Sequence, residues 1–411
     1  MDLEIINIGD ELLIGQVLNT NAAFVAKRLN KQGIRVVKVT TIGDEPKDIT
    51  AALDSALANA DCVLMTGGLG PTKDDMTKNI LAEYFHQSLV EHSGMLKKIE
   101  HYFALRQQNL TPTNRKQALL PQNAIIIENN VGTAAGMCFK KGTKLVFSLP
   151  GVPFEMAEMM PEVERIIKEN YQTGFIVHRT LLLSGIGESY LSDMIQEWED
   201  ALPCGVKVAY LPNAGLIRLR LSAYGGDESV LQEIERQIER LLPLIKDYFI
   251  GFEKDNISQT LAEKLISLSA NLAVAESCSG GNLAHQITLN QGASSYFKGS
   301  VTAYSNEVKE QVLQVKKDVL LTFGAVSEQT AVAMAEGVMR LFDSDFAIST
   351  TGIAGPTGGT AEKPIGTVWI CVCDNKGNKL TKKCFFPTTR SNFIERTTNE
   401  AFFLLLKLMT R

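Results

Sequence analysis

Apolar runs alternate with amphipathic segments along the N-terminal part of the chain. The apolar runs predict buried strands at residues 3–8, 34–42, 61–66 and 144–153, the last closing on a proline turn. The amphipathic segments between them predict helices at residues 21–31 and 47–60. Strands that alternate with helices indicate a parallel, doubly wound sheet, whose ligands bind at the carboxyl ends of the strands.

The pattern changes in the middle of the chain. Two strand-like runs, at residues 175–185 and 216–226, are each followed by an amphipathic helix, at residues 188–202 and 228–245. The turn Gly185-Ile186-Gly187-Glu188 has two interpretations, an anion-binding loop or a tight turn before a helix, and the turn is favoured. This segment predicts a small α+β domain that serves spacing or oligomerisation.

Alternation of strands and helices returns in the last part of the chain, with strands at residues 271–277, 300–305, 345–352 and 366–377. The predicted fold class is therefore α/β, with two α/β sandwich domains joined by a small α+β middle domain. The predicted domains cover residues 1–172, 173–252 and 253–411.

Composition excludes several classes of partner. The 411 residues carry a formal net charge of −5, so we expect no stable binding of nucleic acid. No run of apolar residues is long enough for a transmembrane helix, so we expect no membrane partner. The seven cysteines are scattered, which is typical of buried free thiols in a reducing cytoplasm, where we place the protein. We also expect a homodimer, because the central domain is small.

Acidic side chains and glycines gather where the first strands end. Neighbouring carboxylates facing a glycine loop suit a divalent cation such as Mg²⁺, Mn²⁺ or Co²⁺ that neutralises a diphosphate. The candidate metal ligands are Asp10, Glu11, Asp44, Asp74 and Asp75. The candidate phosphate-binding residues are Gly67, Gly68, Gly70 and Thr72. The alternative is that Asp74 and Asp75 only cap the following helix.

Hydroxyl groups and one lysine gather in the last domain, where Ser277, Ser279, Ser294, Tyr304 and Lys309 follow an apolar strand. None of the five histidines is well placed as a base for these serines. A lysine serves as a base when desolvation lowers its pKa, so this segment predicts a Ser-Lys hydrolase. Ser277 and Cys278 are rival nucleophiles; an inert, packed thiol is the favoured interpretation of Cys278.

The N-terminal motifs GDELLIGQVLNTN (residues 9–21), TGGLGPTKDDMT (66–77) and LPGVPFEM (149–156) resemble the competence/damage-inducible protein A (CinA) family. The TGG-G…D-x-T pattern is also similar to molybdopterin-binding domains, in which the acid matching Asp75 serves metal and nucleotide. Asp44 matches the preceding acid at a strand end. For this domain the resemblance implies a metal-dependent pyrophosphatase that acts on ADP-ribose.

The same resemblance continues through AESCSGG (residues 275–281), AYSNEVK (303–309), TGIAGPTGG (351–359) and KPIGTV (363–368), so that it covers essentially the whole chain. It implies a nicotinamide-nucleotide amidohydrolase that converts nicotinamide mononucleotide (NMN) to nicotinic acid mononucleotide and ammonia without a cofactor. By motif, Ser294 in GASSYF (residues 292–297) is the expected nucleophile, Lys309 its base, Tyr304 a hydrogen-bonding partner and Ser277 a supporting hydroxyl. The expected substrate-binding residues are Ser279, Gly280, Gly281, Thr351, Gly352, Gly355 and Arg390.

Together these features predict a bifunctional enzyme of NAD salvage whose ligands are the small nucleotides NMN and ADP-ribose. Two alternatives stay open: an N-terminal domain that binds a pterin or nucleotide without turnover, and a scaffold in competence or DNA damage. Intact Asp44, Asp74 and Asp75 favour catalysis, because mere phosphate binding would prefer cations to acids. The acidic net charge disfavours the scaffold.

Overall fold

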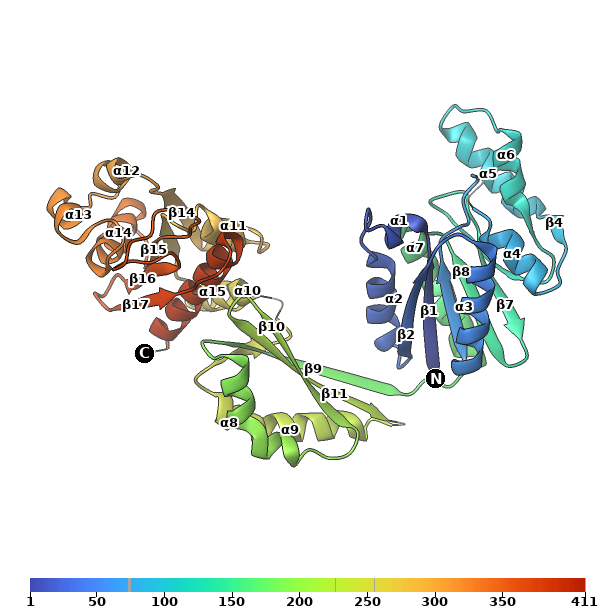
Figure 1. Ribbon diagram of the computed structural model, residues 1–411, viewed down its shortest axis with the longest axis horizontal. Helices are drawn as coiled ribbons and strands as arrows, with labels where there is room; N and C mark the ends of the chain where they lie inside the picture. Colours follow the sequence, from blue (N-terminus) through green and yellow to red (C-terminus); the bar gives the residue numbers. More distant parts are fainter. Residues whose placement is uncertain (73–74, 226, 255, 411) are drawn as a thin grey trace. The chain divides into compact units, whose positions relative to one another are not determined.

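The computed structural model describes residues 1–72, 75–225, 227–254 and 256–410 (Figure 1). The chain forms two compact units. Unit 1 comprises Met1–Val177 with Tyr224–Leu231, and unit 2 comprises His178–Ala223 with Gln232–Arg411. Within the described residues, no helix has the length and apolar character that crossing a membrane requires.

Unit 1 is built on a six-stranded sheet in the order β2-β1-β3-β8-β7-β6. The parallel strands are β1 (Asp2–Ile8), β2 (Arg35–Ile42), β3 (Cys62–Thr66) and β8 (Lys144–Leu149). The other two, β7 (Gly136–Lys141) and β6 (Ile125–Ile127), run antiparallel at one edge. The predicted parallel sheet is therefore mixed, because a two-residue turn at Gly142, where φ is 63°, folds β7 directly back onto β8.

Helices cover both faces of this sheet. Along β1, Leu3 and Ile5 pack against one layer of helices, whereas Ile6 and Ile8 pack against the other. The first layer holds α2 (Thr20–Asn30) and α7 (Pro153–Asn170), and the second holds α3 (Pro46–Asn59), α4 (Thr77–Tyr84) and α5 (Ser93–Leu105). The smaller elements are α1 (Asp10–Leu13), α6 (Pro112–Arg115), η1 (Lys116–Ala118), β4 (Leu89–Glu91) and β5 (Leu119–Pro121).

The middle part of the chain forms a four-stranded sheet in the order β10-β11-β9-β12. Its strands are β9 (Phe175–Ser184), β10 (Val206–Asn213), β11 (Leu216–Gly225) and β12 (Phe249–Phe252), and its helices are α8 (Glu188–Asp200) and α9 (Ser229–Ile245). Helix α9 buries Ile234, Ile238, Leu241 and Ile245, the spacing expected for one apolar face. The predicted α+β class is confirmed.

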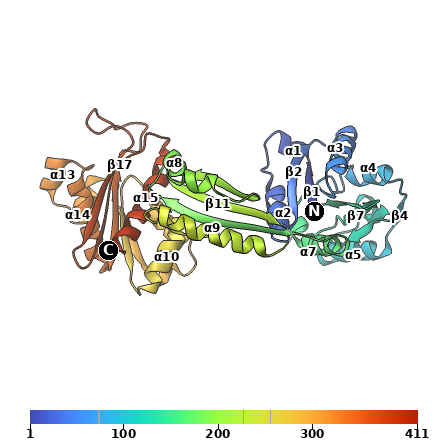
Figure 2. The same cartoon turned by 90° about the horizontal axis from the view of Figure 1, so that it is seen from below.

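The last part of the chain carries a five-stranded sheet in the order β14-β13-β15-β16-β17. Strands β13 (Leu272–Glu276), β14 (Phe297–Thr302) and β15 (Phe346–Gly352) are parallel, and β16 (Thr367–Asp374) and β17 (Lys379–Phe385) are antiparallel. The sheet lies between α14 (Glu328–Phe342) on one face and α10 (Ile257–Ser267) with α15 (Arg390–Leu408) on the other (Figure 2). The remaining helices are α11 (Asn282–Thr288), η2 (Ala293–Ser295), α12 (Asn306–Gln311) and α13 (Lys317–Phe323).

Within unit 2, the middle sheet packs directly on the last domain. Leu182 and Leu216 belong to the same buried apolar cluster as the side chains of α15. Asn399 on α15 donates a hydrogen bond of 3.0 Å from Nδ2 to the carbonyl oxygen of Ala214. The predicted class of two α/β domains and one α+β domain is thus confirmed; the predicted domain boundaries stay predictions.

The turn at Gly185 depends on the absence of a side chain. Its φ is 83°, and a Cβ there would lie 2.4 Å from Cε1 of Phe403 on α15. We expect Gly185→Ala to destabilise the protein by about 1–3 kcal/mol through this clash, in addition to about 1 kcal/mol of backbone strain. Gly205→Ala is the matched control, because Gly205 also has a positive φ, 99°, but nothing lies within 4 Å of its Cβ position. Urea unfolding of both variants measures the difference, and equal losses would contradict the close packing.

Candidate functional site

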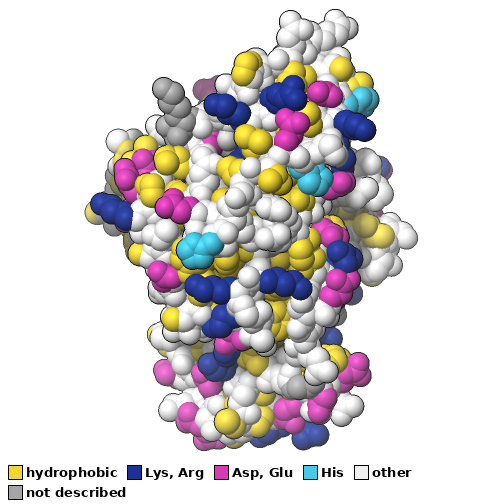
Figure 3. Space-filling model, turned by 90° about the vertical axis from the view of Figure 1, so that its right-hand side faces the viewer, with side chains coloured by type: hydrophobic (Ala, Val, Ile, Leu, Met, Phe, Trp, Pro, Cys, Tyr) yellow, Lys and Arg dark blue, Asp and Glu magenta, His cyan; other side chains and the backbone are white. Residues whose placement is uncertain are grey.

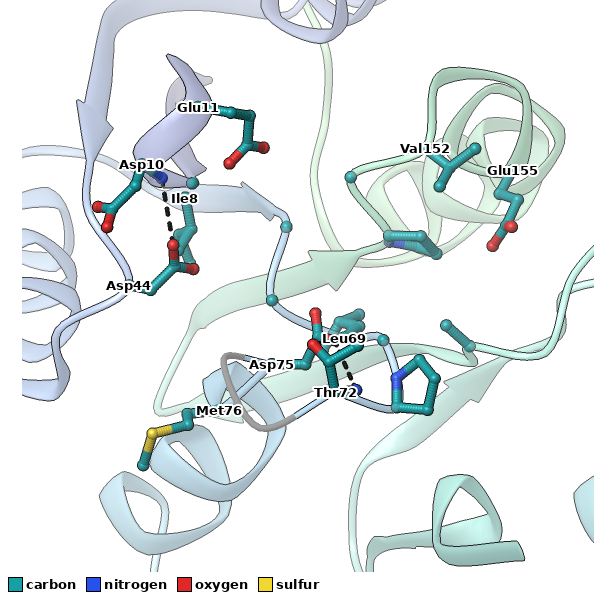
Figure 4. Close-up of a pocket in the computed structure, with 18 of the residues that line it drawn as sticks. Ile8, Asp10, Glu11, Asp44, Leu69, Thr72, Asp75, Met76, Val152 and Glu155 are labelled. Carbon is teal, nitrogen blue, oxygen red and sulfur yellow. Dashed lines mark hydrogen bonds between the residues drawn. The ribbon is translucent and has the colours of Figure 1, made fainter. Parts of the chain in front are cut away.

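A cavity of about 850 Å³ opens at the edge of the unit 1 sheet where the parallel strands end (Figure 4). The turns that follow β1, β2, β3 and β8 all contribute to its lining. These turns supply Asp10 and Glu11, Asp44, residues 67–72 and residues 150–152. The predicted convergence of the polar strand ends is therefore present in the structure.

Carboxylates form one wall of this cavity. The Asp10 N–H donates a hydrogen bond of 3.1 Å to Oδ2 of Asp44. Burial raises the pKa of the Asp44 carboxyl, although the Asp10 N–H lowers it. The negative charges of Asp10, Glu11 and Asp75 add to the rise. Among the described residues, no lysine or arginine forms an ion pair with these acids, so their oxygens are the uncompensated hard donors that suit a divalent cation.

The glycine loop after β3 requires its glycines. A Cβ at Gly67 would lie 2.2 Å from the carbonyl oxygen of Ile8, and one at Gly70 would lie 2.4 Å from Oδ2 of Asp75. Thr72 donates to the same Asp75 oxygen from its backbone nitrogen at 2.9 Å and from Oγ1 at 2.6 Å. Asp75 therefore closes the loop instead of capping α4, whose N-cap is Met76. Gly68 also lines the cavity.

The predicted cluster of five metal ligands needs a correction. Among the described residues, no three His, Cys, Asp or Glu side chains are close enough together to hold a metal ion. Asp10, Glu11, Asp44 and Asp75 line one cavity, but Asp75 is held by Thr72, away from Asp44 (Figure 4). Asp74 lies outside the described residues.

One acid of this cavity was not predicted from the sequence. Glu155 lies in the first turn of α7, on the wall opposite the other carboxylates (Figure 4). Asn129 Nδ2 donates to Glu155 Oε2 at 2.7 Å, and Asn129 Oδ1 accepts from two backbone N–H groups, which fixes the orientation of the amide. Burial raises the pKa of Glu155, against the effect of the Asn129 hydrogen bond. The signal for it was the proline turn at residues 150–153 followed by an acid in a helix first turn.

A second cavity, of about 340 Å³, lies in unit 2 at the carboxyl ends of β13 and β15. Ser277 enters it from the turn after β13, and Lys309 from α12. Thr351, Gly352 and Gly355 contribute the loop after β15. Tyr304 and Arg390 also line this cavity.

Lys309 is almost completely buried, with 1 % of its surface exposed. Its Nζ lies 3.2 Å from Oγ of Ser277, 2.8 Å from the carbonyl oxygen of Ala303 and 3.5 Å from that of Ser305. Burial lowers the pKa of Lys309, although the charge of Glu307 raises it. A neutral amine has two N–H groups and one lone pair. The two carbonyls occupy the N–H groups, so the lone pair of the neutral form faces the Ser277 hydroxyl.

Ser294 is not near Lys309, which corrects the predicted pairing of these residues. Ser294 lies in η2, which precedes the amino end of β14. Because β14 is parallel to β13, with Leu272 opposite Phe297 and Glu276 opposite Thr302, Ser294 is at the other end of the sheet from Ser277. Its exposed side chain does not line the cavity, and Ser277 supplies the hydroxyl beside the lysine.

The turn after Ser277 faces away from the cavity, which corrects the predicted substrate-binding role of Ser279, Gly280 and Gly281. None of these three residues lines the cavity. Ser279 is buried, with its Oγ 2.7 Å from Oγ1 of Thr350. The N–H of Gly281 donates to the fully buried carboxylate of Glu276 at 3.0 Å, as do two N–H groups of α11. These donors are therefore already used within the protein.

Arg390 ties the loop after β15 to Tyr304. Its Nη1 donates to the carbonyl oxygen of Gly355, and its Nη2 donates to Oη of Tyr304, both at 2.8 Å. Thr351 Oγ1 donates to the carbonyl of Ala325 at 2.6 Å, so that hydroxyl also holds the loop. Within the described part of the chain, Arg390 forms no ion pair with a carboxylate, so its charge is available to an anionic ligand.

Comparison with known proteins gives three family matches. Residues 4–168 match a probable molybdopterin binding domain, residues 178–251 the damage-inducible protein CinA KH domain, and residues 254–409 the CinA C-terminal domain. A CinA-like protein of Cytophaga hutchinsonii is 41% identical over 396 residues, covering 96% of this chain and 94% of the relative. One of Flavobacterium psychrophilum is 42% identical over 414 residues, covering 99% and 98%. A crystal structure of a CinA protein of unknown function from Thermoplasma acidophilum is 37% identical, covers 40% of this chain and 96% of its own, and has a TM-score of 0.38.

The rival nucleophile Cys278 is expected to be unreactive. Only 5 % of its surface is exposed, and burial raises the pKa of its thiol to about 12. Cys204, in contrast, is exposed. Iodoacetamide at pH 8 should therefore alkylate Cys204 and leave Cys278 unmodified, as measured by peptide mass spectrometry. Rapid alkylation of Cys278 in the folded protein would restore it as a candidate nucleophile.

Proposed function

The chain belongs to the CinA family, and from that premise we propose that it is a hydrolase with two sites for small nucleotides. Unit 2 deamidates NMN to nicotinic acid mononucleotide and ammonia, and unit 1 hydrolyses ADP-ribose to AMP and ribose 5-phosphate. The observation that carries the proposal is the contact between the buried Lys309 amine and the Ser277 hydroxyl inside a cavity. This contact gives a serine the neighbouring base that it needs to act as a nucleophile.

The deamidation proceeds in two halves. Neutral Lys309 takes the proton from Ser277 Oγ, the oxygen bonds to the carboxamide carbon, and the C–N bond breaks as the lysine returns the proton to the departing ammonia. Water then adds to the ester carbon, Lys309 takes a proton from that water, and the serine leaves with the proton restored. The products are the free carboxylic acid and the original enzyme, so atoms and charge balance.

Arg390 is placed to hold the phosphate of the substrate. Its guanidinium is anchored at both Nη atoms to the walls of the cavity, which fixes its plane. A planar, fixed guanidinium pairs with phosphate oxygens more specifically than a flexible ammonium does. This arrangement supports a nucleotide over an uncharged amide as the substrate.

In unit 1, one or two of the carboxylates of this wall, with Asp44 as the first candidate, would hold a divalent cation such as Mg²⁺, Mn²⁺ or Co²⁺ together with oxygens of the bound diphosphate. The cation would neutralise the diphosphate of ADP-ribose. Glu155, on the opposite wall, has a raised pKa and one oxygen held by Asn129. Its other oxygen can therefore accept a proton from the attacking water. A second candidate function is nucleotide or pterin binding without turnover, favoured by the lack of three converging acids among the described residues.

The face drawn in Figure 3 gives no support for nucleic acid as a partner. On the face shown in Figure 3, acidic and basic side chains are interspersed and do not form a continuous basic field. The net charge of −5 points the same way. Small nucleotides bound inside cavities therefore fit the chain better than a polynucleotide on its surface.

We expect Ser277→Ala to lower the rate of ammonia release from NMN by about 10³-fold or more, because it removes the nucleophile. Lys309→Met should cause a loss of the same order with the fold retained. Ser294→Ala is the matched control and should stay within about threefold of the parent. An enzyme-coupled ammonia assay on the full chain measures all three. If Ser294→Ala abolished turnover while Ser277→Ala did not, the nucleophile would be Ser294; no release by the folded parent would refute the deamidase.

We expect the chain to release AMP from ADP-ribose only with Mg²⁺, Mn²⁺ or Co²⁺, and EDTA to stop the reaction. Asp44→Asn should lower this rate by about 10²-fold, since it removes a charge that holds the cation. Asp48→Asn is the control, because Asp48 is an exposed acid of the next helix outside the cavity. Chromatography of the products measures the rate. If the chain bound ADP-ribose tightly but released no AMP with any of the three metals, nucleotide binding without turnover would be favoured instead.

A further inference from the structure

A third cavity, of about 430 Å³, has no part in either proposed reaction. It lies within unit 2, where the middle sheet meets the last domain. Lys246 and Asp247, just after α9, and two residues of β12 form one side, and residues of α10 and α15 form the other. Small-molecule sites of this size occur preferentially where domains meet.

The inner wall of this cavity is apolar and partly aromatic. Phe249 and Ile250 contribute from β12, and Phe403 and Leu406 from α15. The Phe403 ring is held from outside by Gly185, whose close approach leaves no room for a side chain. Thr260 of α10 also lines this wall, with its Oγ1 buried behind the surface.

Three lysines, Lys246, Lys264 and Lys407, line the same cavity, against one acid, Asp247. In the described part of the chain, none of the three ammonium groups forms an ion pair or a hydrogen bond, and the Lys407 amine lies over the Phe403 ring, 4.4 Å from its centroid. The lining of this cavity therefore carries a formal charge of about +2, whereas the whole chain has a net charge of −5. Free cations around an apolar wall match a ligand that is both anionic and apolar.

We propose that this cavity binds a mononucleotide, with the phosphate on the lysines and the planar base against Phe249, Phe403 and Leu406. The aromatic side chain of Phe249 in this wall favours a flat base over a flexible hydrocarbon chain. The volume is about half that of the cavity proposed for ADP-ribose, 430 against 850 Å³, which favours one nucleoside with its phosphate over a dinucleotide. This site is independent of both proposed reactions.

The test is amide hydrogen–deuterium exchange of the full chain, titrated separately with AMP, adenosine and inorganic phosphate. AMP should protect residues 246–252 and 403–410, which distinguishes this site from the other two cavities. Adenosine and inorganic phosphate should each require at least about a tenfold higher concentration for the same protection, because each lacks half of the interactions. Equal protection by phosphate alone would overturn the mononucleotide class.

The variant Lys246→Gln/Lys407→Gln should weaken this protection by at least about tenfold while NMN turnover stays at the parent level. Lys298→Gln is the control, since Lys298 is an exposed lysine of β14 outside the cavity and should bind AMP as the parent does. No AMP protection of these segments in the folded parent, or unchanged protection in the double variant, would overturn the proposal. Neither result depends on whether NMN or ADP-ribose is hydrolysed.

Discussion

The burial of one amine, that of Lys309, constrains the whole catalytic region of unit 2. A charged ammonium without a carboxylate partner is costly to bury, so the neutral form is favoured and the pKa falls. The carbonyls of Ala303 and Ser305, on either side of Tyr304, hold the two N–H groups and so fix the segment that enters α12. In the neutral form, the lone pair of the amine can then be directed at Ser277 Oγ, 3.2 Å away, which is the orientation that proton transfer from the serine requires.

The turn that carries Ser277 is stabilised by a buried carboxylate, that of Glu276. Glu276 is fully buried, yet its two carboxylate oxygens accept three backbone N–H groups from Gly281, Leu283 and Ala284. Those donors would otherwise be the unsatisfied groups at the start of α11. Next along the chain, the Ser277 N–H bonds to the carbonyl of Thr350 on β15 at 3.0 Å, which fixes the serine backbone. The Glu276 carboxylate thus fixes the turn between β13 and α11, and it does not line the neighbouring cavity that contains Ser277.

The sequence predicted the architecture and both polar edges because strand and helix periodicities are local, and because parallel strands end on one edge of a sheet. The predictions from the sequence were wrong or incomplete where the position of a residue depended on the direction of a strand or on a contact between distant segments of the chain. The motif resemblance pairs Ser294 with Lys309, although Ser294 precedes β14 and Lys309 follows it, which puts the two at opposite ends of that strand. Glu155 was missed because its importance comes from burial and from Asn129, a contact between distant segments. The antiparallel edge of unit 1 was missed because one tight turn at Gly142 decides it.

Each of the two proposed sites lies at the carboxyl ends of the parallel strands of its own sheet, but the charged side chains at the two sites have opposite signs. In unit 1 the strand ends carry acids, and burial together with the neighbouring negative charges raises the pKa of Asp44, so a bound cation would stabilise both these acids and a diphosphate. In unit 2 the cavity at the strand ends is lined by Ser277, the desolvated Lys309 and Arg390, which forms no ion pair among the described residues and can meet a phosphate directly. The difference lies in the few side chains at the strand ends, not in the fold. Glu276 already uses the N–H groups at the start of α11, whereas the Arg390 guanidinium lines the cavity and can supply positive charge to a ligand there.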